Sequence, residues 1–152
     1  MLNKNITIAI DVMGGDSAPL KTLQGIEIFL QKNYDVDIVL FGKKNLIEST
    51  IEDNHINLKK HDIINTENNI QDDDSPNNII RNRKDSSISV GLEYIKDKKK
   101  SGFISAGNTA AIMILSKLKL GMLEGIDRPA ICSNIPNQQD YSLMLDLGAN
   151  VY

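Results

Sequence analysis

The stretch SGFISAGNTAAIMILSKLKLG, from Ser101 to Gly121, decides the fold. It begins with a short apolar run, continues through the small residues Ser105-Ala106-Gly107-Asn108-Thr109, and ends in a strongly apolar helical pattern. This succession predicts a strand, a tight turn and the start of a helix. Asn108 or Thr109 can cap that helix, because each side chain offers an oxygen to the free N–H groups of the first helical turn.

The same turn has the features of an anion-binding site. Ala106 and Gly107 let the backbone come close to a ligand. The helix start adds exposed N–H groups and the positive end of the helix dipole. A well-capped β–α turn that binds nothing has the same composition, so both interpretations stay open on this stretch alone.

On either side of this stretch, predicted strands and helices alternate. Strands are expected at 5–11, 36–41 and 56–65, and helices at 20–30, 44–54, 77–81 and 86–99. Such alternation indicates an α/β fold with three α/β/α layers around a mostly parallel, Rossmann-like sheet. Near the C-terminus, strands at 128–135 and 142–147 follow each other across a short turn and can form an antiparallel hairpin.

Three further expectations concern local structure. Ser17 is expected to cap the helix that starts near Leu20, with Pro19 in its first turn. The polar stretch 66–76 is typical of a mobile surface loop. No linker divides the sequence, so residues 1–152 are expected to form a single α/β domain.

Composition excludes several classes of protein. The net charge of −3 gives no electrostatic reason to expect nucleic acid as a partner. One cysteine and two histidines argue against a structural zinc site, and Cys132, within a predicted strand, is expected to be buried. The N-terminus lacks a signal-peptide pattern, and the longest apolar run, Ala110 to Leu115, is too short to span a bilayer. A cytoplasmic location is therefore expected.

The ends of three predicted strands carry similar chemistry. The first ends in Asp11 and Gly14-Gly15-Asp16, another in residues 105–109, and the last in Asp146-Leu147-Gly148-Ala149-Asn150. Ligands of open α/β sheets bind at the carboxyl ends of the strands. If the strands are parallel, the three loops share one edge and can offer several backbone N–H groups to an oxyanion. Each loop alone is explained by turn chemistry; the three together favour a site.

The sequence contains neither a G-x-x-x-x-G-K-[ST] nor a G-x-G-x-x-G motif, so no nucleotide-binding motif is visible. Ser105 has no histidine near it in sequence, which argues against a Ser–His hydrolase. Arg128 can bind phosphate or carboxylate in a bidentate fork; an ion pair with Asp127 or Glu124 explains it equally well. Arg81 and Arg83 are expected to be surface residues.

Five motifs, in order along the chain, resemble the phosphate acyltransferase family of bacterial phospholipid synthesis. They are Ile10-Asp11-Val12-Met13-Gly14-Gly15-Asp16, Arg83-Lys84-Asp85-Ser86-Ser87, Ser105-Ala106-Gly107-Asn108-Thr109, Glu124-Gly125-Ile126-Asp127-Arg128-Pro129-Ala130 and Leu145-Asp146-Leu147-Gly148-Ala149-Asn150-Val151. Ala110 departs from the glycine usual in the family. Members of the family continue well past the last motif. The resemblance therefore implies that this chain is the N-terminal half of a longer family fold.

The resemblance implies an enzyme that transfers a fatty acyl group from acyl carrier protein to inorganic phosphate, forming acyl phosphate, without a metal or redox cofactor. It also implies a homodimer and peripheral membrane contact through parts absent here. A truncated, non-catalytic fragment that binds phosphate or pairs with a subunit is the alternative.

We assign roles to the residues of the matched motifs on this basis. Asn108 and Asn150 are the expected catalytic residues. The substrate-binding residues are expected to be Gly14, Gly15, Asp16, Ser105, Gly107, Thr109, Arg128 and Gly148. Because carboxylates repel phosphate, Asp11 and Asp16 are expected to brace the loops by accepting N–H hydrogen bonds.

Overall fold

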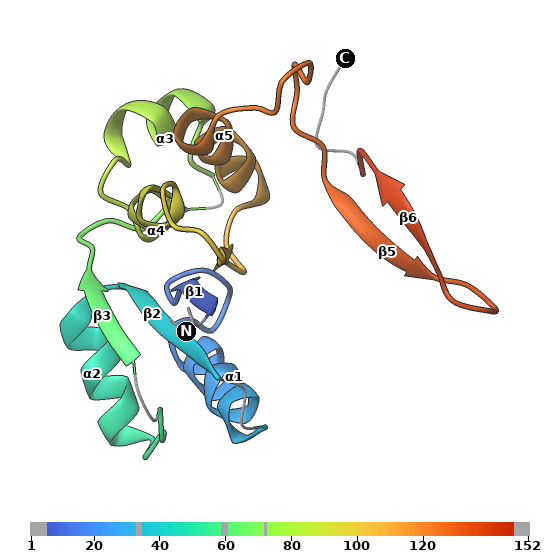
Figure 1. Ribbon diagram of the computed structural model, residues 1–152. Coiled ribbons are helices and arrows are strands. Elements are labelled where there is room, and N and C mark those ends of the chain that lie inside the picture. The colour runs from blue at the N-terminus through green and yellow to red at the C-terminus, as the bar shows by residue number, and fades with distance from the viewer. Residues whose placement is uncertain (1–5, 33–34, 59–60, 72, 148–152) are drawn as a thin grey trace. The chain divides into compact units, whose positions relative to one another are not determined.

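The computed structural model describes residues 6–32, 35–58, 61–71 and 73–147. The chain folds as two compact units, Met1–Leu120 and Gly121–Tyr152, and each is described by itself (Figure 1). The single domain expected for residues 1–152 stays a prediction.

A four-stranded parallel sheet forms the centre of the first unit. Its strands are β1 (Ile6–Asp11), β2 (Val36–Gly42), β3 (His61–Asn65) and β4 (Ser101–Ile104), in the order β3-β2-β1-β4. All three pairings are parallel, and Ile10 of β1 lies in register with Leu40 of β2 and Ile104 of β4. The carboxyl ends of β1 and β4 therefore lie side by side, as the sequence predicts.

Helices cover both faces of this sheet (Figure 1). The helices α1 (Leu20–Gln31) and α2 (Lys44–Asp53) pack on one face, and α4 (Ser87–Ile95) packs on the other, followed outward by α3 (Pro76–Asn82) and α5 (Thr109–Leu120). Successive residues of a strand face opposite sides of the sheet. Ile10 therefore faces α1, whereas its neighbour Ala9 faces α4. The three α/β/α layers are thus confirmed.

Several boundaries differ from the sequence-based ones. β3 begins at His61, so the predicted strand at 56–65 is too long, although Ile56 is buried in the core. The proposed cap Ser17 is wrong: Pro19 is the N-cap of α1 without a side-chain hydrogen bond, and Ser17 only accepts the Lys21 N–H through its carbonyl oxygen. The cap predicted for α5 is confirmed, because Asn108 Oδ1 accepts the Ala111 N–H at 2.8 Å.

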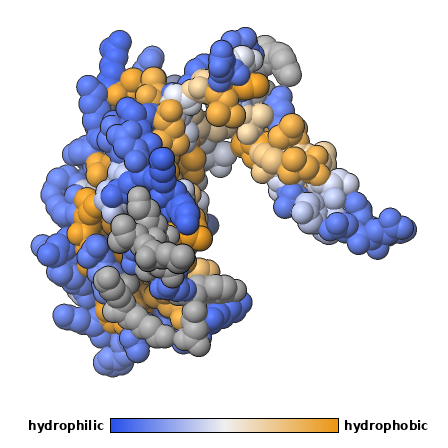
Figure 2. All heavy atoms as spheres, in the orientation of Figure 1, coloured by the Kyte–Doolittle hydropathy of each residue, from blue (hydrophilic) through white to orange (hydrophobic). Residues whose placement is uncertain are grey.

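The second unit contains the predicted antiparallel hairpin. Its strands are β5 (Cys132–Pro136) and β6 (Tyr141–Leu145), paired with Cys132 opposite Leu145. Figure 2 shows hydrophobic residues at the end of the hairpin away from the turn and hydrophilic ones at the turn, where Asn137 Oδ1 accepts two backbone N–H groups. Cys132 is exposed, so its predicted burial is wrong. A two-stranded ribbon has no second layer of its own to cover its faces.

Candidate functional site

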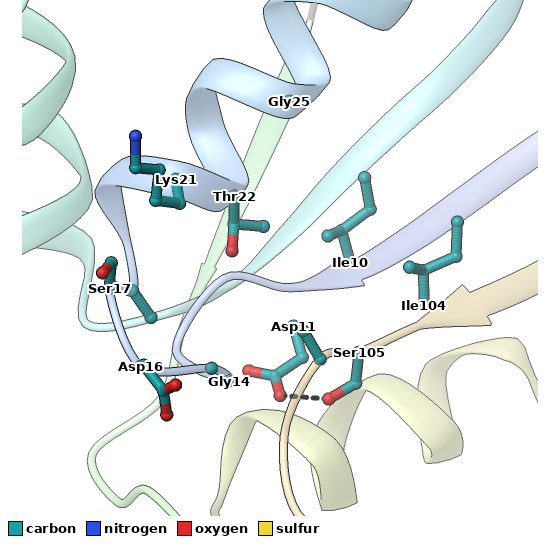
Figure 3. A pocket seen from close by; sticks show the side chains of 13 residues that line it. Ile10, Asp11, Gly14, Asp16, Ser17, Lys21, Thr22, Gly25, Ile104 and Ser105 are labelled. Atoms are coloured by element: carbon teal, nitrogen blue, oxygen red, sulfur yellow. Dashed lines mark hydrogen bonds between the residues drawn. The ribbon is translucent and has the colours of Figure 1, made fainter.

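Two loops meet at the carboxyl edge of the parallel sheet, after β1 and after β4. Asp11, at the end of β1, is almost fully buried, with 2% of its surface exposed. Its Oδ2 accepts the Ser105 hydroxyl at 2.6 Å (Figure 3). Its Oδ1 accepts the Met13 N–H at 3.0 Å. One buried carboxylate therefore holds its own loop in shape and ties it to the neighbouring loop, as expected for a bracing residue.

Glycines let the backbones of the two loops touch. A Cβ atom added to Gly14 would lie 2.6 Å from the Gly107 nitrogen and 2.9 Å from the Gly107 Cα, closer than any side chain allows. Gly15 has a φ of +98°, a conformation that side chains other than glycine rarely adopt. The backbone geometry thus requires glycine at these two positions of the Gly-Gly-Asp motif.

The hydrogen bonds within the loops determine which donors remain for a ligand. The Ser105 hydroxyl donates to Asp11, and the Gly107 N–H donates to Ser105 Oγ at 3.0 Å, so both are already used. Within the described residues, the N–H groups of Gly14, Gly15 and Asp16 have no acceptor, nor have those at positions 109 and 110 at the start of α5. An oxyanion would find its donors in the backbone here.

Two cavities lie on either side of the Gly14–Asp16 segment. The first, of about 480 Å³, lies between this segment, the start of α1 and the end of β4; we call it the α1-side cavity. The second, of about 330 Å³, is enclosed by the same segment, Asn69–Gln71 and Ala106–Asn108; we call it the 69–71 cavity. Both lie within the first unit, and Ala106 lines both.

Most of the predicted site residues of the first unit lie at these cavities. Gly14, Gly15 and Asp16 line both cavities, Ser105 lines the α1-side cavity, and Gly107 and Asn108 line the 69–71 cavity. The exposed Thr109 lines neither. The Asp16 carboxylate is exposed and makes no hydrogen bond within the described residues, so it does not brace its loop.

The third predicted loop is not brought to this edge by strand pairing. Its strand β6 belongs to the separate two-stranded sheet of the second unit. Arg128 also belongs to that unit. Gly148 and Asn150 lie outside the described residues. Their part in the site stays a prediction.

One wall of the site, the segment Asn69–Gln71, is not indicated by the sequence patterns. It falls in the stretch 66–76 that the sequence indicated as a mobile surface loop, yet it lines the 69–71 cavity. The Asn108 Nδ2 donates a long hydrogen bond, 3.5 Å, to the Gln71 carbonyl oxygen. The Asn69 Oδ1 is buried without a partner within the described residues. Only the nearby Arg83-Lys84-Asp85 motif gave a signal that this region belongs to the site.

An ion pair holds that segment in place. The Arg83 guanidinium donates through two nitrogens to the Asp74 carboxylate, each at 3.0 Å, and Asp74 also accepts from the Gln71 N–H and from Asn78. The hydrogen bond from Arg83, then that from Gln71, holds the pKa of Asp74 below its usual value. The Asp74 carboxylate raises the pKa of Arg83 in turn. Arg83 is thus a partly buried structural residue, whereas Arg81 is exposed.

We predict that Arg83→Gln raises the pKa of Asp74 toward that of a free aspartate, about 3.9. Because the folded-state pKa is lowered, the stabilisation is present above the unfolded-state pKa and is lost as the pH falls through the folded-state pKa. The Arg83→Gln variant should therefore be less stable than the wild type at neutral pH, with the difference disappearing in acid. Carboxyl titration by ¹³C NMR and urea unfolding measure both effects. Arg81→Gln is the matched control, and an equal shift in that variant would contradict the assignment.

Among the described residues, no helix combines the length and apolar character needed to cross a membrane. Nor do these residues bring three His, Cys, Asp or Glu side chains together in an arrangement suited to a metal ion.

Comparison with known proteins agrees with the resemblance. The family model described as "Fatty acid synthesis protein" matches residues 6–152. A phosphate acyltransferase of Caldicellulosiruptor saccharolyticus is 42% identical over 143 residues, which cover 94% of this chain and 43% of that protein. For the phosphate acyltransferase of Pelagibacter ubique the identity is 38% over 150 residues, covering 99% of this chain and 44% of the relative.

The chain spans less than half the length of these relatives. The family match nevertheless extends over nearly all of the chain and includes both loops of the site and the hairpin. The protein therefore belongs to the fatty acid synthesis protein family, as its resemblance to the phosphate acyltransferases predicts.

Proposed function

We propose that this chain carries the phosphate-binding part of an acyltransferase that moves a fatty acyl group from acyl carrier protein to inorganic phosphate, forming acyl phosphate for phospholipid synthesis. The observation that carries the proposal is the contact between Gly14 and Gly107. It joins the two loops so that N–H groups without acceptors lie along the Gly14–Asp16 segment, beside the start of α5. Relatives named phosphate acyltransferase support an acyltransferase role.

The reaction requires phosphate to be held and aimed at the thioester carbonyl. A phosphate oxygen forms a bond to the carbonyl carbon, the carbon–sulfur bond breaks, and the carrier thiolate leaves and takes up a proton. In the proposal, the backbone N–H groups of Gly14–Asp16 and of the first turn of α5 bind the phosphate oxygens, as anions bind at helix starts. Asn108, on the wall of the 69–71 cavity, supplies an amide donor to the developing oxyanion.

Other groups are assigned by the resemblance and complete the proposal. By resemblance alone, Arg128, Gly148 and Asn150 take part in the reaction, with Arg128 supplying positive charge for phosphate. The protein acts as a homodimer in the cytoplasm and makes peripheral contact with the membrane. Acyl carrier protein and inorganic phosphate are its substrates.

The test is phosphate-dependent consumption of acyl–acyl carrier protein by the purified 152-residue chain, after circular dichroism has confirmed that the chain is folded. Formation of acyl phosphate would support the proposal. A folded chain that forms none would favour the alternative, a non-catalytic chain that binds phosphate or pairs with a subunit. Phosphate binding by ³¹P NMR and a concentration-dependent mass would then separate these two roles.

Asn108 gives a prediction that separates its two roles. Asn108→Ala removes the cap of α5, which we expect to destabilise the protein by about 1 kcal/mol. Because it also removes the amide donor, acyl phosphate formation should fall at least about 100-fold. Urea unfolding and the turnover assay measure the two effects.

Asn108→Asp is the matched variant, since it keeps the oxygen that caps α5 and loses the Nδ2 donor. It should unfold like the wild type and still lose turnover. If Asn108→Asp keeps wild-type turnover, Asn108 is only a cap.

A further inference from the structure

An apolar groove leads away from the α1-side cavity along the sheet. A cavity of about 270 Å³ continues from it between α1 and the sheet, and both are lined by Ile10, Thr22, Gly25 and Ile104. A third, of about 550 Å³, follows at the amino ends of the strands, lined by Ile6, Ile8 and Gly102 among others. We call the three together the β1–β4 groove.

The register of the sheet makes the groove continuous. Ile10 pairs with Ile104, and both side chains lie on the α1 side of the sheet (Figure 3). Two residues earlier, Ile8 pairs with Gly102, so β4 offers no side chain there. From Ile10 to Ile6, the apolar floor extends roughly 13 Å at about 3.3 Å per residue.

Two glycines inside regular elements keep the groove open. Gly25 lies in the interior of α1, and Gly102 lies in β4, where glycine weakens a helix or a strand. A Cβ atom added to either would meet nothing within 4 Å, so the packing of the protein does not require glycine at these positions. Both line the groove, which larger side chains would narrow.

The groove has a polar mouth and an apolar interior, and Lys100 and Ser101 line its far end. Its mouth carries Asp16, Ser17, Lys21 and the backbone of the Gly14–Asp16 segment, whereas its interior is formed mainly by isoleucine and Phe29. An acyl phosphate or acyl thioester has the same order, with a polar head and an alkyl chain. We infer that the β1–β4 groove binds the alkyl chain of the acyl donor, with its carbonyl end at the Gly14–Asp16 segment. This inference rests on the proposed function.

The test uses palmitic acid that carries a photoreactive diazirine near its end, with unlabelled palmitate as competitor. The full chain should bind palmitate saturably and form crosslinks in peptides that contain residues 22–29 and 101–104. Gly25→Leu should weaken palmitate binding at least tenfold without lowering the thermal midpoint. Gly102→Val lies farther from the mouth, so it should weaken the binding of palmitate while leaving that of octanoate unchanged.

Gln31→Leu is the matched control, because it adds the same side chain to an exposed position of α1 outside the groove. It should bind palmitate like the wild type. Crosslinks confined to other peptides, or unchanged affinity in both glycine variants, would overturn the inference. So would crosslinking that is lost when the chain self-associates, because a second copy would then occupy the groove.

The outcomes also separate this inference from the proposed function. If the wild type binds palmitate in the groove but forms no acyl phosphate, the proposed function is wrong, whereas the inference that the groove binds an alkyl chain is supported. If the wild type forms acyl phosphate and the Gly25→Leu variant uses a palmitoyl donor equally well, the inference about the groove is wrong, whereas the proposed function is supported.

Discussion

Gly14→Ala should lower the rate of acyl phosphate formation by about 100-fold while leaving the rest of the fold in place. The added Cβ would lie 2.6 Å from the Gly107 nitrogen, 2.7 Å from Asp11 Oδ2 and 2.9 Å from the Gly107 Cα. Two of these atoms belong to the backbone and cannot turn aside as a flexible side chain would. The two loops must therefore separate, and a displacement of about 1 Å in a reacting site lowers the rate by about 100-fold.

The same separation should destabilise the protein by about 1–3 kcal/mol, the usual effect of forcing atoms into a packed region. Urea unfolding measures this loss, and ³¹P NMR measures the expected loss of phosphate binding. Gly25→Ala is the control for stability alone, because its Cβ meets nothing within 4 Å, and it should unfold no earlier than the wild type. Wild-type phosphate affinity in Gly14→Ala would show that the loops need not touch.

Local patterns predicted the elements that form the site. The alternation of strands and helices predicts a parallel sheet, because parallel strands need a crossover between them. The position of Asn108 and Thr109 after a short strand predicts that one of them caps α5, and Asn108 does so through a hydrogen bond between residues three positions apart. These features are encoded within a few neighbouring residues, so they can be predicted from the sequence alone.

Contacts between distant segments could not be predicted in the same way. The Asn69–Gln71 wall depends on a contact between residues 37 positions apart, and the bond between Asp11 and Ser105 joins residues 94 positions apart. A polar, acidic stretch such as 66–76 has the composition of an unattached loop. Its attachment depends on Arg83 reaching back nine residues to Asp74, which composition does not reveal. The predicted burial of Cys132 is wrong for a related reason, because strand periodicity does not tell whether a second layer covers the strand.

Asp11→Ala should have the second large effect, because Asp11 holds both loops at once. Its removal leaves the Met13 N–H and the Ser105 hydroxyl without their acceptor in a buried place. Hydrogen bonds to a charged group contribute about 1.5–3 kcal/mol each, so losing both should lower the free energy of unfolding, measured with urea, by about 3–6 kcal/mol. Ser105 Oγ also accepts the Gly107 N–H, so the turn before α5 should loosen as well.

The Asp11→Asn variant distinguishes the bracing of the loops by Asp11 from the effect of its negative charge. Asparagine keeps Oδ1 for the Met13 N–H, and its amide can donate to Ser105 Oγ, so the contact between the loops is preserved with its direction reversed. If Asp11 acts by positioning the loops, Asn should restore most of the stability lost in Asp11→Ala and also the KM for phosphate. Removing a negative charge close to the bound phosphate should, if anything, lower that KM further. An Asn variant that is as stable as the wild type but has lost turnover would contradict the bracing role, because the carboxylate would then act on the reaction through its charge and not through the geometry of the loops.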